Sequence, residues 1–543
     1  MTIFVPIPAF FLAGAPSLSN QLLDALSDNT FVGIHHLEFF DWAIMVPYFA
    51  VLAVLSMYGL HRYETIRGYM KHRKRMNSAE PALRFAELPR VTIQLPIFNE
   101  RFVVERLLEE TAKMDYPRHL LQIQVLDDST DDTHPFTEEL VREYRDSGLP
   151  IEYIHRTNRH GYKAGALENG LKTATGELVA VFDADFIPPR DFLQRTIHFF
   201  TDPKVGVVQT RWTYLNRGHN VLTEVQAILL DGHFVLEHIA RSGGGLFFNF
   251  NGTAGILRKS MIQDAGGWQH DTLTEDSDLS YRAQLKGWKF VYAPGVECLS
   301  ELPVETYGFQ VQQSRWAKGL TQVAMKLLPS ILRSELPWRV KVEAFFHLTP
   351  NIGYPLMIVV SVLMLPVMIV RFYMGWVEML LIDLPLIAAS FWSISAFYVV
   401  AQRELFPNNW KRSLMFLPAL MAAGVALTII NTKAFFEALI GYQTAFARTA
   451  KYGVQKTPQA NLQYRRRSGW LPYAELLAGV AFLAIVVYAI RSYNYLAIPF
   501  LLLFVGGYFW AGVTTLWNEY QGKLAFDRER ALAAQQQAQA AKA

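Results

Sequence analysis

Long uncharged segments near both ends of the chain constrain its fold more than any other feature. Residues 42–60 contain no charged side chain and approach the ~20 residues that span a bilayer. No comparable segment occurs between residues 76 and 345. Further apolar segments lie at 346–370, 379–400, 413–431, 473–491 and 496–517. Charged residues make up only 18% of the chain, against about 25% in soluble domains, so we predict an α-helical transmembrane domain that flanks a soluble domain.

The distribution of Lys and Arg predicts the orientation of the first helix. Neither residue type occurs before Arg62, and six such residues occur between residues 61 and 75. Because segments rich in Lys and Arg tend to stay in the cytoplasm, we expect residues 1–41 to be an extracytoplasmic or interfacial segment. The chain that follows residues 42–60 then begins on the cytoplasmic side of the membrane.

A second basic stretch determines how the later segments are interpreted. Residues 443–470 hold six Lys and Arg residues and no acidic residue. If all five later segments crossed the membrane, this loop would lie outside, against the positive-inside bias. We therefore favour five crossings, with residues 413–441 interfacial or re-entrant, and keep six crossings as the alternative.

These arguments predict a multi-pass protein of a cell membrane, such as a bacterial inner membrane, with its soluble domain in the cytoplasm. The expected order is an extracytoplasmic or interfacial segment at 1–41, a transmembrane helix at 42–60, the cytoplasmic domain at 76–335, two transmembrane helices within 346–400, an interfacial or re-entrant helix at 413–441, a cytoplasmic loop at 442–470, two transmembrane helices within 473–517 and a cytoplasmic tail at 518–543. The net charge of +3 is too small to indicate a nucleic-acid partner, whereas the lipid bilayer is an expected one.

The central segment alternates between strand and helix patterns. The runs RVTIQLPI (90–97) and LQIQVLD (121–127) are rich in β-formers, and a helical pattern separates them. A third apolar run, 178–183, follows a helical segment at 163–174. This alternation predicts βαβ units and a mainly parallel sheet, whose ligands bind beyond the carboxyl ends of the strands. Polar clusters stand at those ends: Asn99–Glu100, Asp127–Asp128 and Asp183–Asp185.

The D-x-D pair, Asp183 and Asp185, predicts a cation site. Carboxylates two apart on an extended segment project to the same side, and their repulsion is costly unless a cation lies between them. An isolated D-x-D is often only a solvated turn or a helix cap. Here a second acidic pair stands at another strand end, which favours a divalent ion, Mg²⁺ or Mn²⁺, that bridges to a diphosphate. The single cysteine, Cys298, excludes an intrachain disulfide and a cysteine-rich metal site.

Two further stretches supply candidate catalytic groups. LTEDSDL (273–279) places Glu275, Asp276 and Asp278 at the start of a helix that Thr274 could cap. Acids in a first helical turn either complement the helix dipole or, as the alternative, one of them is a general base. In QVQQSRWAKG (310–319), Arg315 offers a fork of donors to phosphate oxygens, and Trp316 offers a flat face to a sugar ring.

In this order, D-D, D-x-D, T-E-D and Q-x-x-R-W resemble the motifs of the inverting nucleotide-sugar glycosyltransferases of family 2 in the membrane-integrated cellulose synthase superfamily. The resemblance covers roughly residues 88–456 and implies an α/β glycosyltransferase-A type domain, a Rossmann-like mixed sheet, beside an α-helical transmembrane domain. Several stretches are most similar to the plant cellulose synthase-like A and C proteins, which make glucomannan and xyloglucan backbones. They are VLDDSTDDT (125–133), GYKAGAL (161–167), FNGTAGILR (250–258), QQSRWAKG (312–319) and NTKAFFEALIGYQTAFARTAKYG (431–453).

The resemblance also implies roles for individual residues. Asp127, Asp128 and Lys163 would contact the nucleotide, beside the strand-end residues Asn99 and Glu100. Asp183 and Asp185 would hold the metal and the diphosphate, and Asp276 would be the general base. Gln312, Arg315 and Trp316 would bind the leaving diphosphate and the acceptor. The stretch FARTAKY (446–452) resembles a gating loop, with Phe446, Arg448, Thr449 and Lys451 as its candidate contacts.

The expected function is that of an inverting, processive β-glycosyltransferase. It would polymerise a hexose from UDP-glucose, GDP-mannose or GDP-glucose into a β-1,4-glucan or a mannan, and translocate the growing polysaccharide across the membrane. The alternative is a single transfer to a lipid acceptor such as ceramide, because such enzymes have similar motifs. A non-catalytic scaffold or transporter is disfavoured, because every expected carboxylate is present.

Overall fold

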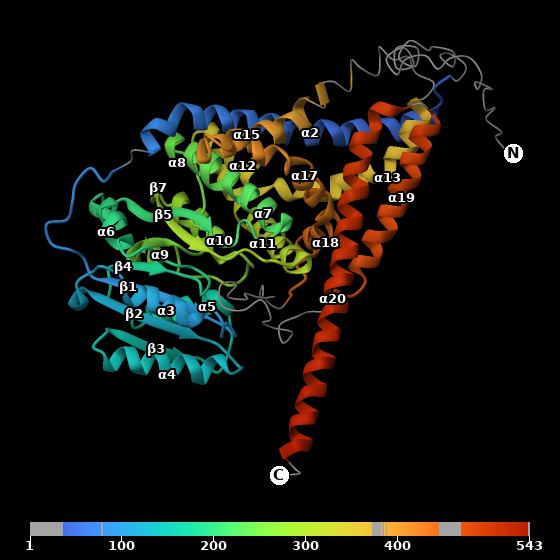
Figure 1. The fold of residues 1–543 in the computed structure, drawn as a ribbon. Helices are drawn as coiled ribbons and strands as arrows, with labels where there is room; N and C mark the ends of the chain where they lie inside the picture. The colour runs from blue at the N-terminus through green and yellow to red at the C-terminus, as the bar shows by residue number, and fades with distance from the viewer. Residues whose placement is uncertain are drawn as a thin grey trace.

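A seven-stranded mixed sheet forms the centre of the soluble domain (Figure 1). The computed structural model describes residues 36–77, 80–371, 388–444, 468–492 and 494–540, with isolated positions between 382 and 386, and side chains up to residue 524. The strands are β1 (Val91–Ile97), β2 (Leu121–Asp127), β3 (Ile151–His155), β4 (Leu178–Val181), β5 (Val205–Tyr214), β6 (Gly255–Arg258) and β7 (Lys289–Ser300). Their order is β3-β2-β1-β4-β6-β5-β7. Only β6 runs antiparallel to its neighbours among these strands, so the predicted mixed α/β sheet is confirmed.

Alternating side chains along the strands give the sheet two buried faces. In β1, Ile93 and Leu95 join one apolar cluster, whereas Gln94 points to the other face and donates to Gln124 Oε1 (3.0 Å). Helices cover both faces and leave the carboxyl ends of the parallel strands open for a site. They are α3 (Val104–Ala112), α4 (Thr133–Asp146), α5 (Tyr162–Leu171), α6 (Phe192–Thr196), α9 (Lys259–Asp264) and α10 (Glu275–Leu285), with the short turns η1 (Arg118–Leu120) and η2 (Ile197–Thr201).

A layer of helices joins the sheet to the first long helix, α2 (Phe39–Asn77), which crosses the top of Figure 1. One continuous helical segment in this layer contains a π-helical turn, a feature that is frequent near functional sites. The layer comprises α7 (Val221–Asp231), the π-turn η3 (Gly232–Glu237), α8 (His238–Gly244), α11 (Thr306–Arg333), α12 (Trp338–Leu348) and α15 (Ser393–Leu405). The sheet and its helices are therefore packed directly against α2.

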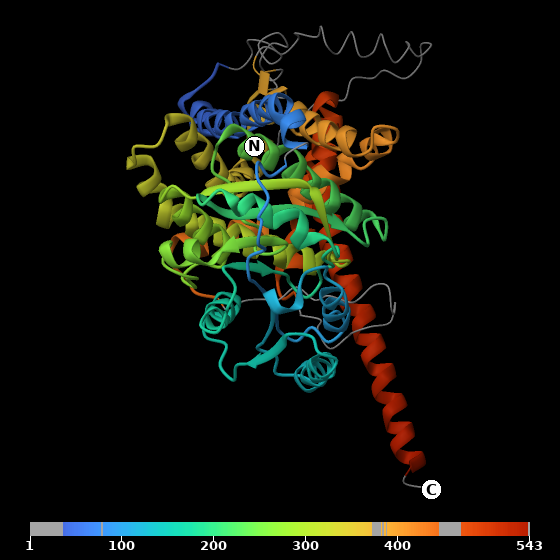
Figure 2. The same ribbon diagram turned by 90° about the vertical axis from the view of Figure 1, so that its left-hand side faces the viewer.

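Four helices within the described residues are long and apolar enough to cross a membrane. They are Phe39–Asn77, Pro350–Arg371, Leu471–Arg491 and Tyr495–Leu524, which include α2, η4 (Pro350–Ile352), α13 (Gly353–Arg371), α19 (Leu471–Arg491), η7 (Tyr495–Ala497) and the first part of α20 (Ile498–Ala540). Helix α2 is longer than the predicted 42–60. Helix α20 runs on well past the rest of the molecule (Figure 2), so the predicted tail begins as a continuous helix.

The segment predicted to be interfacial or re-entrant is broken into α16 (Trp410–Leu414), α17 (Leu417–Ala426) and α18 (Thr428–Leu439). Its two main parts are bent by 42°, a geometry that fits either a broken span or a re-entrant loop. The predicted span at 379–400 lies partly outside the described residues. Its described end forms the π-turn η5 (Ala388–Trp392) and the start of α15. The count of five crossings therefore stays a prediction.

Cysteine labelling will distinguish five crossings from six. Cys298 is buried, so a cysteine introduced at the exposed Ile440, 76% accessible, reports its own side of the membrane. With five crossings, Ile440→Cys is expected to react with a membrane-impermeant maleimide only after the cells are permeabilised. Tyr495→Cys, in the turn before α20, is the matched control and should react in intact cells. The reverse pattern would establish six crossings.

Candidate active site

The loops that follow β1 and β2 are tied together by Asn99. Its backbone has a φ of 53°, a left-handed conformation that asparagine tolerates better than most residues. Asn99 N donates to Ser129 Oγ (2.8 Å), and Thr130 N donates to Asn99 Oδ1 (2.8 Å). Asn99 therefore shapes the edge of the site by holding one strand-end loop against the next.

Both carboxylates of the D-D pair are held by groups of the neighbouring strand. Asp127 is fully buried and accepts from Ser129 N (2.8 Å) and from Tyr153 OH (2.5 Å). Arg156 forms a bidentate pair with Asp128, through Nε to Oδ1 (2.8 Å) and Nη2 to Oδ2 (2.5 Å). A bidentate pair of this kind fixes the orientation of both side chains as well as pairing their charges. The carboxyl ends of β2 and β3 are therefore held together as one rigid surface.

Two histidines next to Asp127 could be mistaken for metal ligands. Asp127, His134 and His155 offer ligand atoms that all lie within 4.8 Å of one another. However, the two imidazoles are stacked, with ring centroids 4.0 Å apart and planes only 20° from parallel. The lone pair of a ring nitrogen lies in the ring plane, so two stacked rings do not converge on one ion. This pair instead offers a flat surface, which the sequence did not predict.

Lys163 connects the D-x-D motif to the glycine turn of the FNGTAG stretch. It forms an ion pair with Asp183, and its Nζ donates to the carbonyl of Gly252 (3.0 Å). The backbone N–H of Asp183 donates to Thr253 Oγ1 (2.9 Å). Burial of Lys163 beside a carboxylate keeps a positive charge at the edge of the sheet, where phosphate oxygens would need it.

The geometry of the D-x-D pair differs from the sequence prediction. Strand β4 ends at Val181, and the chain then turns, with Phe186 N donating to the carbonyl of Asp183 (3.0 Å). The two carboxylates therefore do not project together from an extended strand. The Asp183 side chain is partly exposed, whereas Asp185 is buried. Both still lie at the carboxyl end of β4.

Asp276 lies in direct contact with the glycine turn. A Cβ built at Gly252, whose φ is +80°, would lie 2.9 Å from Asp276 Oδ2 and 3.5 Å from Lys163 Nζ. The positive φ favours glycine at this position, and a larger side chain would displace the Asp276 carboxylate. Burial, together with the neighbouring Glu275, raises the pKa of Asp276 to about 7. Asp276 is therefore a carboxyl group that changes its charge near neutral pH.

The other acids of the T-E-D segment differ from Asp276. Asp278 forms ion pairs with Arg282 (2.7 Å) and Lys326 (2.8 Å), so its role is to hold α10 in place. Thr274 does not cap α10 as predicted, since its side chain accepts no bond from the first turn. It faces Gly319 of α11, where a built Cβ would lie 2.7 Å from Thr274 Oγ1.

Helix α11 brings Arg315 of the Q-x-x-R-W motif close to the carboxylates of the site. Gln312 and Trp316 are four apart and therefore share one face of the helix. Burial lowers the pKa of Arg315. The negative charges of nearby carboxylates oppose this lowering of the pKa. From the largest effect to the smallest, they are Glu275, Asp183, Asp276 and Glu100. The Arg315 charge is thus surrounded by the predicted site residues.

The profile of glycosyltransferase like family 2 matches residues 89–319, which contain β1 to β7 together with Lys163, Asp276 and Arg315. Residues 89–319 form a family 2 glycosyltransferase domain. Glucomannan 4-beta-mannosyltransferase 1 of Oryza sativa subsp. japonica is 43% identical over 264 residues, covering 47% of this chain and 50% of the relative. Glucomannan 4-beta-mannosyltransferase 7 of Arabidopsis thaliana is 42% identical over 258 residues, covering 46% of each chain. The chain spans about half the length of these curated relatives.

A solved structure of a mannosyltransferase from Pyrobaculum calidifontis, in complex with GDP-Man and Mn2+, also aligns with the chain. The identity is 22% and the TM-score 0.45, and the alignment covers 66% of this chain and 99% of that chain.

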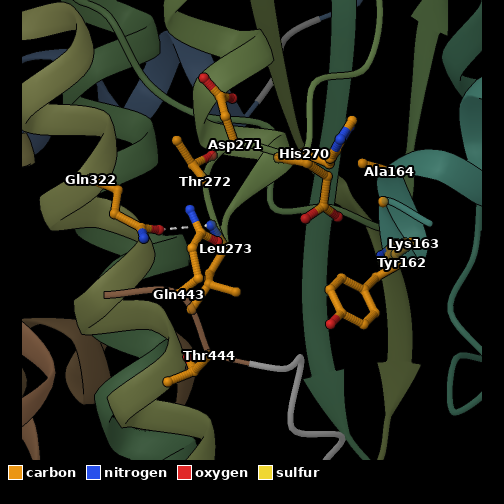
Figure 3. Close-up of a pocket in the computed structure, with 12 residues that line it drawn as sticks. Tyr162, Lys163, Ala164, His270, Asp271, Thr272, Leu273, Gln322, Gln443 and Thr444 are labelled. Atoms are coloured by element: carbon orange, nitrogen blue, oxygen red, sulfur yellow. Dashed lines mark hydrogen bonds between the residues drawn. The ribbon is translucent and has the colours of Figure 1, made fainter. Parts of the chain in front are cut away.

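A small pocket opens at one side of this glycosyltransferase domain (Figure 3). Lys163 and Glu275 lie on its wall, and Leu273 N donates to Gln322 Oε1 (2.9 Å) across it. Gln443 and Thr444 complete the lining. The predicted gating-loop residues follow Thr444 in the sequence and fall outside the described residues: Phe446, Arg448, Thr449 and Lys451.

Sequence reasoning missed several residues that build the site. Tyr153 and Arg156 hold the D-D pair, and Gly252 carries the contact between Lys163 and Asp276. Lys318, 3% exposed, forms an ion pair with Glu437 (3.0 Å) and donates to Thr444 Oγ1 (3.0 Å). Lys318 and Gly252 both fall inside the stretches that resemble known enzymes, so that signal was present, whereas nothing local indicated Tyr153.

Proposed function

We propose that this protein is an inverting, processive β-glycosyltransferase that builds a mannan-type polymer from a nucleotide sugar. The family 2 domain and relatives named glucomannan 4-beta-mannosyltransferase support this proposal. The observation that carries it is the position of Asp276, a carboxyl group with a pKa of about 7 that touches the turn on which Lys163 is bonded. A general base works best when its pKa lies near the operating pH.

The charges of the site residues suggest a role for each of them. Lys163 and Arg315 face the diphosphate as positive groups, while Asp276 takes the proton from the attacking acceptor hydroxyl on the opposite side. Gln312 and Trp316 bind the acceptor and the leaving diphosphate. Attack opposite the leaving group inverts the anomeric carbon, which requires only one base.

The nucleoside would lie over the surface formed by Asp127 and Asp128. There the stacked imidazole rings of His134 and His155 would offer a flat face to the nucleobase. Asn99 and Glu100 border the same edge. GDP-mannose is the donor that the relatives' names favour, and UDP-glucose and GDP-glucose are the other donors to test.

A divalent ion fits the D-x-D turn. Asp183 and Asp185 are hard oxygen donors, and Asp183 Oδ1 already binds Lys163, which leaves Oδ2 for an ion. When bound, Mg²⁺ or Mn²⁺ would neutralise the charge that develops on the departing diphosphate. Its contribution adds to that of Lys163 and Arg315.

The proposed location is a cell membrane, with the glycosyltransferase domain in the cytoplasm and the polymer leaving through the membrane helices. The four candidate spans and the positive charge after residue 60 support this orientation. Because the domain is packed on α2 and α11 leads into the spans, a chain extended at Trp316 starts close to the bilayer.

A donor assay with the purified full-length protein tests this proposal. Incubation with radiolabelled GDP-mannose and a divalent cation should give an alcohol-insoluble product that an endo-β-mannanase degrades. Label that stays in an organic extract would instead indicate transfer to a lipid. If none of GDP-mannose, UDP-glucose and GDP-glucose is turned over, the proposed function is wrong.

A further inference from the structure

Two histidines hold the side chain of Asn251 from both sides. Asn251 Nδ2 donates to His233 Nε2 (2.9 Å), and His238 Nε2 donates to Asn251 Oδ1 (2.6 Å). The backbone N–H of Asn251 donates to Gln209 Oε1 (2.9 Å). The nitrogen and the oxygen of the Asn251 side-chain amide are therefore each hydrogen-bonded to a histidine of the helical segment that contains the π-turn η3. These two bonds determine the orientation of the amide.

A buried charge network keeps both histidines in the required form. Because His233 accepts at Nε2, its proton is on Nδ1, which donates to Glu237 Oε2 (2.8 Å). Although burial alone would raise it, Arg241 and His233 hold the pKa of Glu237 below its usual range, so Glu237 stays ionised. Burial holds the pKa of His238 well below its usual range, so His238 stays neutral and donates only through Nε2.

The network continues to the first membrane helix. Arg241 Nη1 donates to Glu237 Oε2 (3.2 Å), and its Nε donates to Glu343 Oε1 of α12 (2.8 Å). Glu343 also bonds His61 Nε2 of α2 (2.8 Å). The π-turn is thus fixed against two other helices, and it cannot move without breaking buried ion pairs.

The residues that follow Asn251 make the contacts of the active site. Gly252 accepts from Lys163 and touches Asp276, and Thr253 accepts from the N–H of Asp183. Two residues of this turn have positive φ, +80° at Gly252 and 52° at Ala254. Such a backbone persists only where its surroundings hold it in place.

We propose that His233 and His238 are positioning residues, which clamp Asn251 and thereby hold turn 251–254 against Lys163, Asp183 and Asp276. They touch no reacting group, and their effect on the reaction passes through Asn251. The inference rests on the proposed function, because it assigns Lys163 and Asp276 to the transfer step. A misplacement of catalytic groups by about 1 Å can cost on the order of 10²-fold in rate.

Substitutions of His233 provide the first test. His233→Leu removes both bonds and should lower kcat by about 10–100-fold while the dissociation constant for the donor changes less than about threefold. His233→Gln should restore most of the rate, because its amide oxygen accepts from Asn251 and its amide nitrogen donates to Glu237. A merely structural role would instead make both variants lose thermal stability and rate together.

Asn251→Asp provides a second test. The carboxylate oxygen that replaces Nδ2 faces the lone pair of His233 Nε2 and cannot donate to it, whereas the bond from His238 to Oδ1 can remain. We expect kcat to fall by about 10–100-fold, as in His233→Leu.

The outcomes separate this inference from the proposed function. If the wild-type protein turns over a donor and His233→Leu has an unchanged kcat, the positioning role of His233 and His238 is rejected, whereas the proposed glycosyltransferase function is retained. An unchanged kcat in Asn251→Asp also rejects this positioning role. His198→Gln, at a remote histidine beside Phe85, is the control for histidine replacement. If wild type turns over no donor, the function fails first.

Discussion

Replacing Asp276 by asparagine should lower sugar transfer by on the order of 10²–10⁴-fold while leaving donor affinity close to that of wild type. The amide keeps the shape of the side chain and still accepts the bond from Ser277 N (2.7 Å), but it cannot take a proton. Donor affinity should persist, because Lys163 and Arg315 remain. Single-turnover rates and donor titration, measured on the same preparation, separate the two effects.

The pH dependence of wild type checks the same assignment. The base acts when it is ionised, so kcat/KM should rise as pH increases through about 7, the pKa to which burial and Glu275 raise Asp276 in the free protein. This limb should be absent in Asp276→Asn. Since the folded state holds the proton more tightly than the unfolded chain, the fold loses stability as pH rises from 3.8, the ordinary pKa of an aspartate, to about 7, and the loss is complete above that pH. Asp276→Asn should therefore raise Tm above about pH 7.

Asp264→Asn is the matched control for this prediction. Asp264 is half-exposed on α9 and pairs with Lys286 (3.3 Å), away from the site. The variant should keep the wild-type rate. Near-normal transfer by Asp276→Asn would remove the base assignment and leave Glu275 as the candidate, because Asp278 is already occupied by Arg282 and Lys326.

Removal of divalent cations should reduce transfer to background, and addition of Mg²⁺ or Mn²⁺ should restore it. Asp185→Ala should lose donor affinity as well as turnover, because a diphosphate beside Asp183 needs an ion to offset the repulsion between their negative charges. The experiment measures donor binding by calorimetry, with and without EDTA, alongside the transfer assay. Binding provides a readout that does not depend on the chemical step.

Asp191→Ala is the control for the metal prediction. Its side chain is 51% exposed and pairs only at the surface with Arg195 (3.6 Å), beyond the turn that carries the D-x-D motif. Both binding and turnover should survive this change. Full turnover of wild type in excess EDTA would contradict the metal assignment, and Lys163 with Arg315 would then be the groups that stabilise the diphosphate.

Runs of β-forming residues predicted the strands well where every residue of the strand is buried or nearly so. The runs 90–97 and 121–127 correspond to β1 (Val91–Ile97) and β2 (Leu121–Asp127) almost residue for residue. The place where a strand stops was less predictable. The run 178–183 looked like one strand, but β4 ends at Val181, because pairing with β6 ends there. The different exposure of Asp183 and Asp185 follows from that early end.

Long-range contacts account for what the sequence did not reveal about the site. Thr274 is followed by acids, as in a helix cap, yet the approach of Gly319 from α11 directs its side chain elsewhere. Asn251 meets His233 and His238 only because the π-turn shifts the helix register at that point. Neither contact has a signature in neighbouring residues, since the partners come from separate elements.

Side-chain types and local periodicity were enough to identify the groups of the site and their order along the chain: apolar spans around an α/β domain, acids at strand ends, T-E-D at a helix start and an arginine before a tryptophan. These features can be read from each stretch of sequence without its partners. Three features of the site depend on tertiary contacts: which acid has a pKa near 7, which glycine lies between Asp276 and Lys163, and which histidines hold Asn251. Those properties arise from burial and from contacts between distant segments, and only the packed fold brings these groups together.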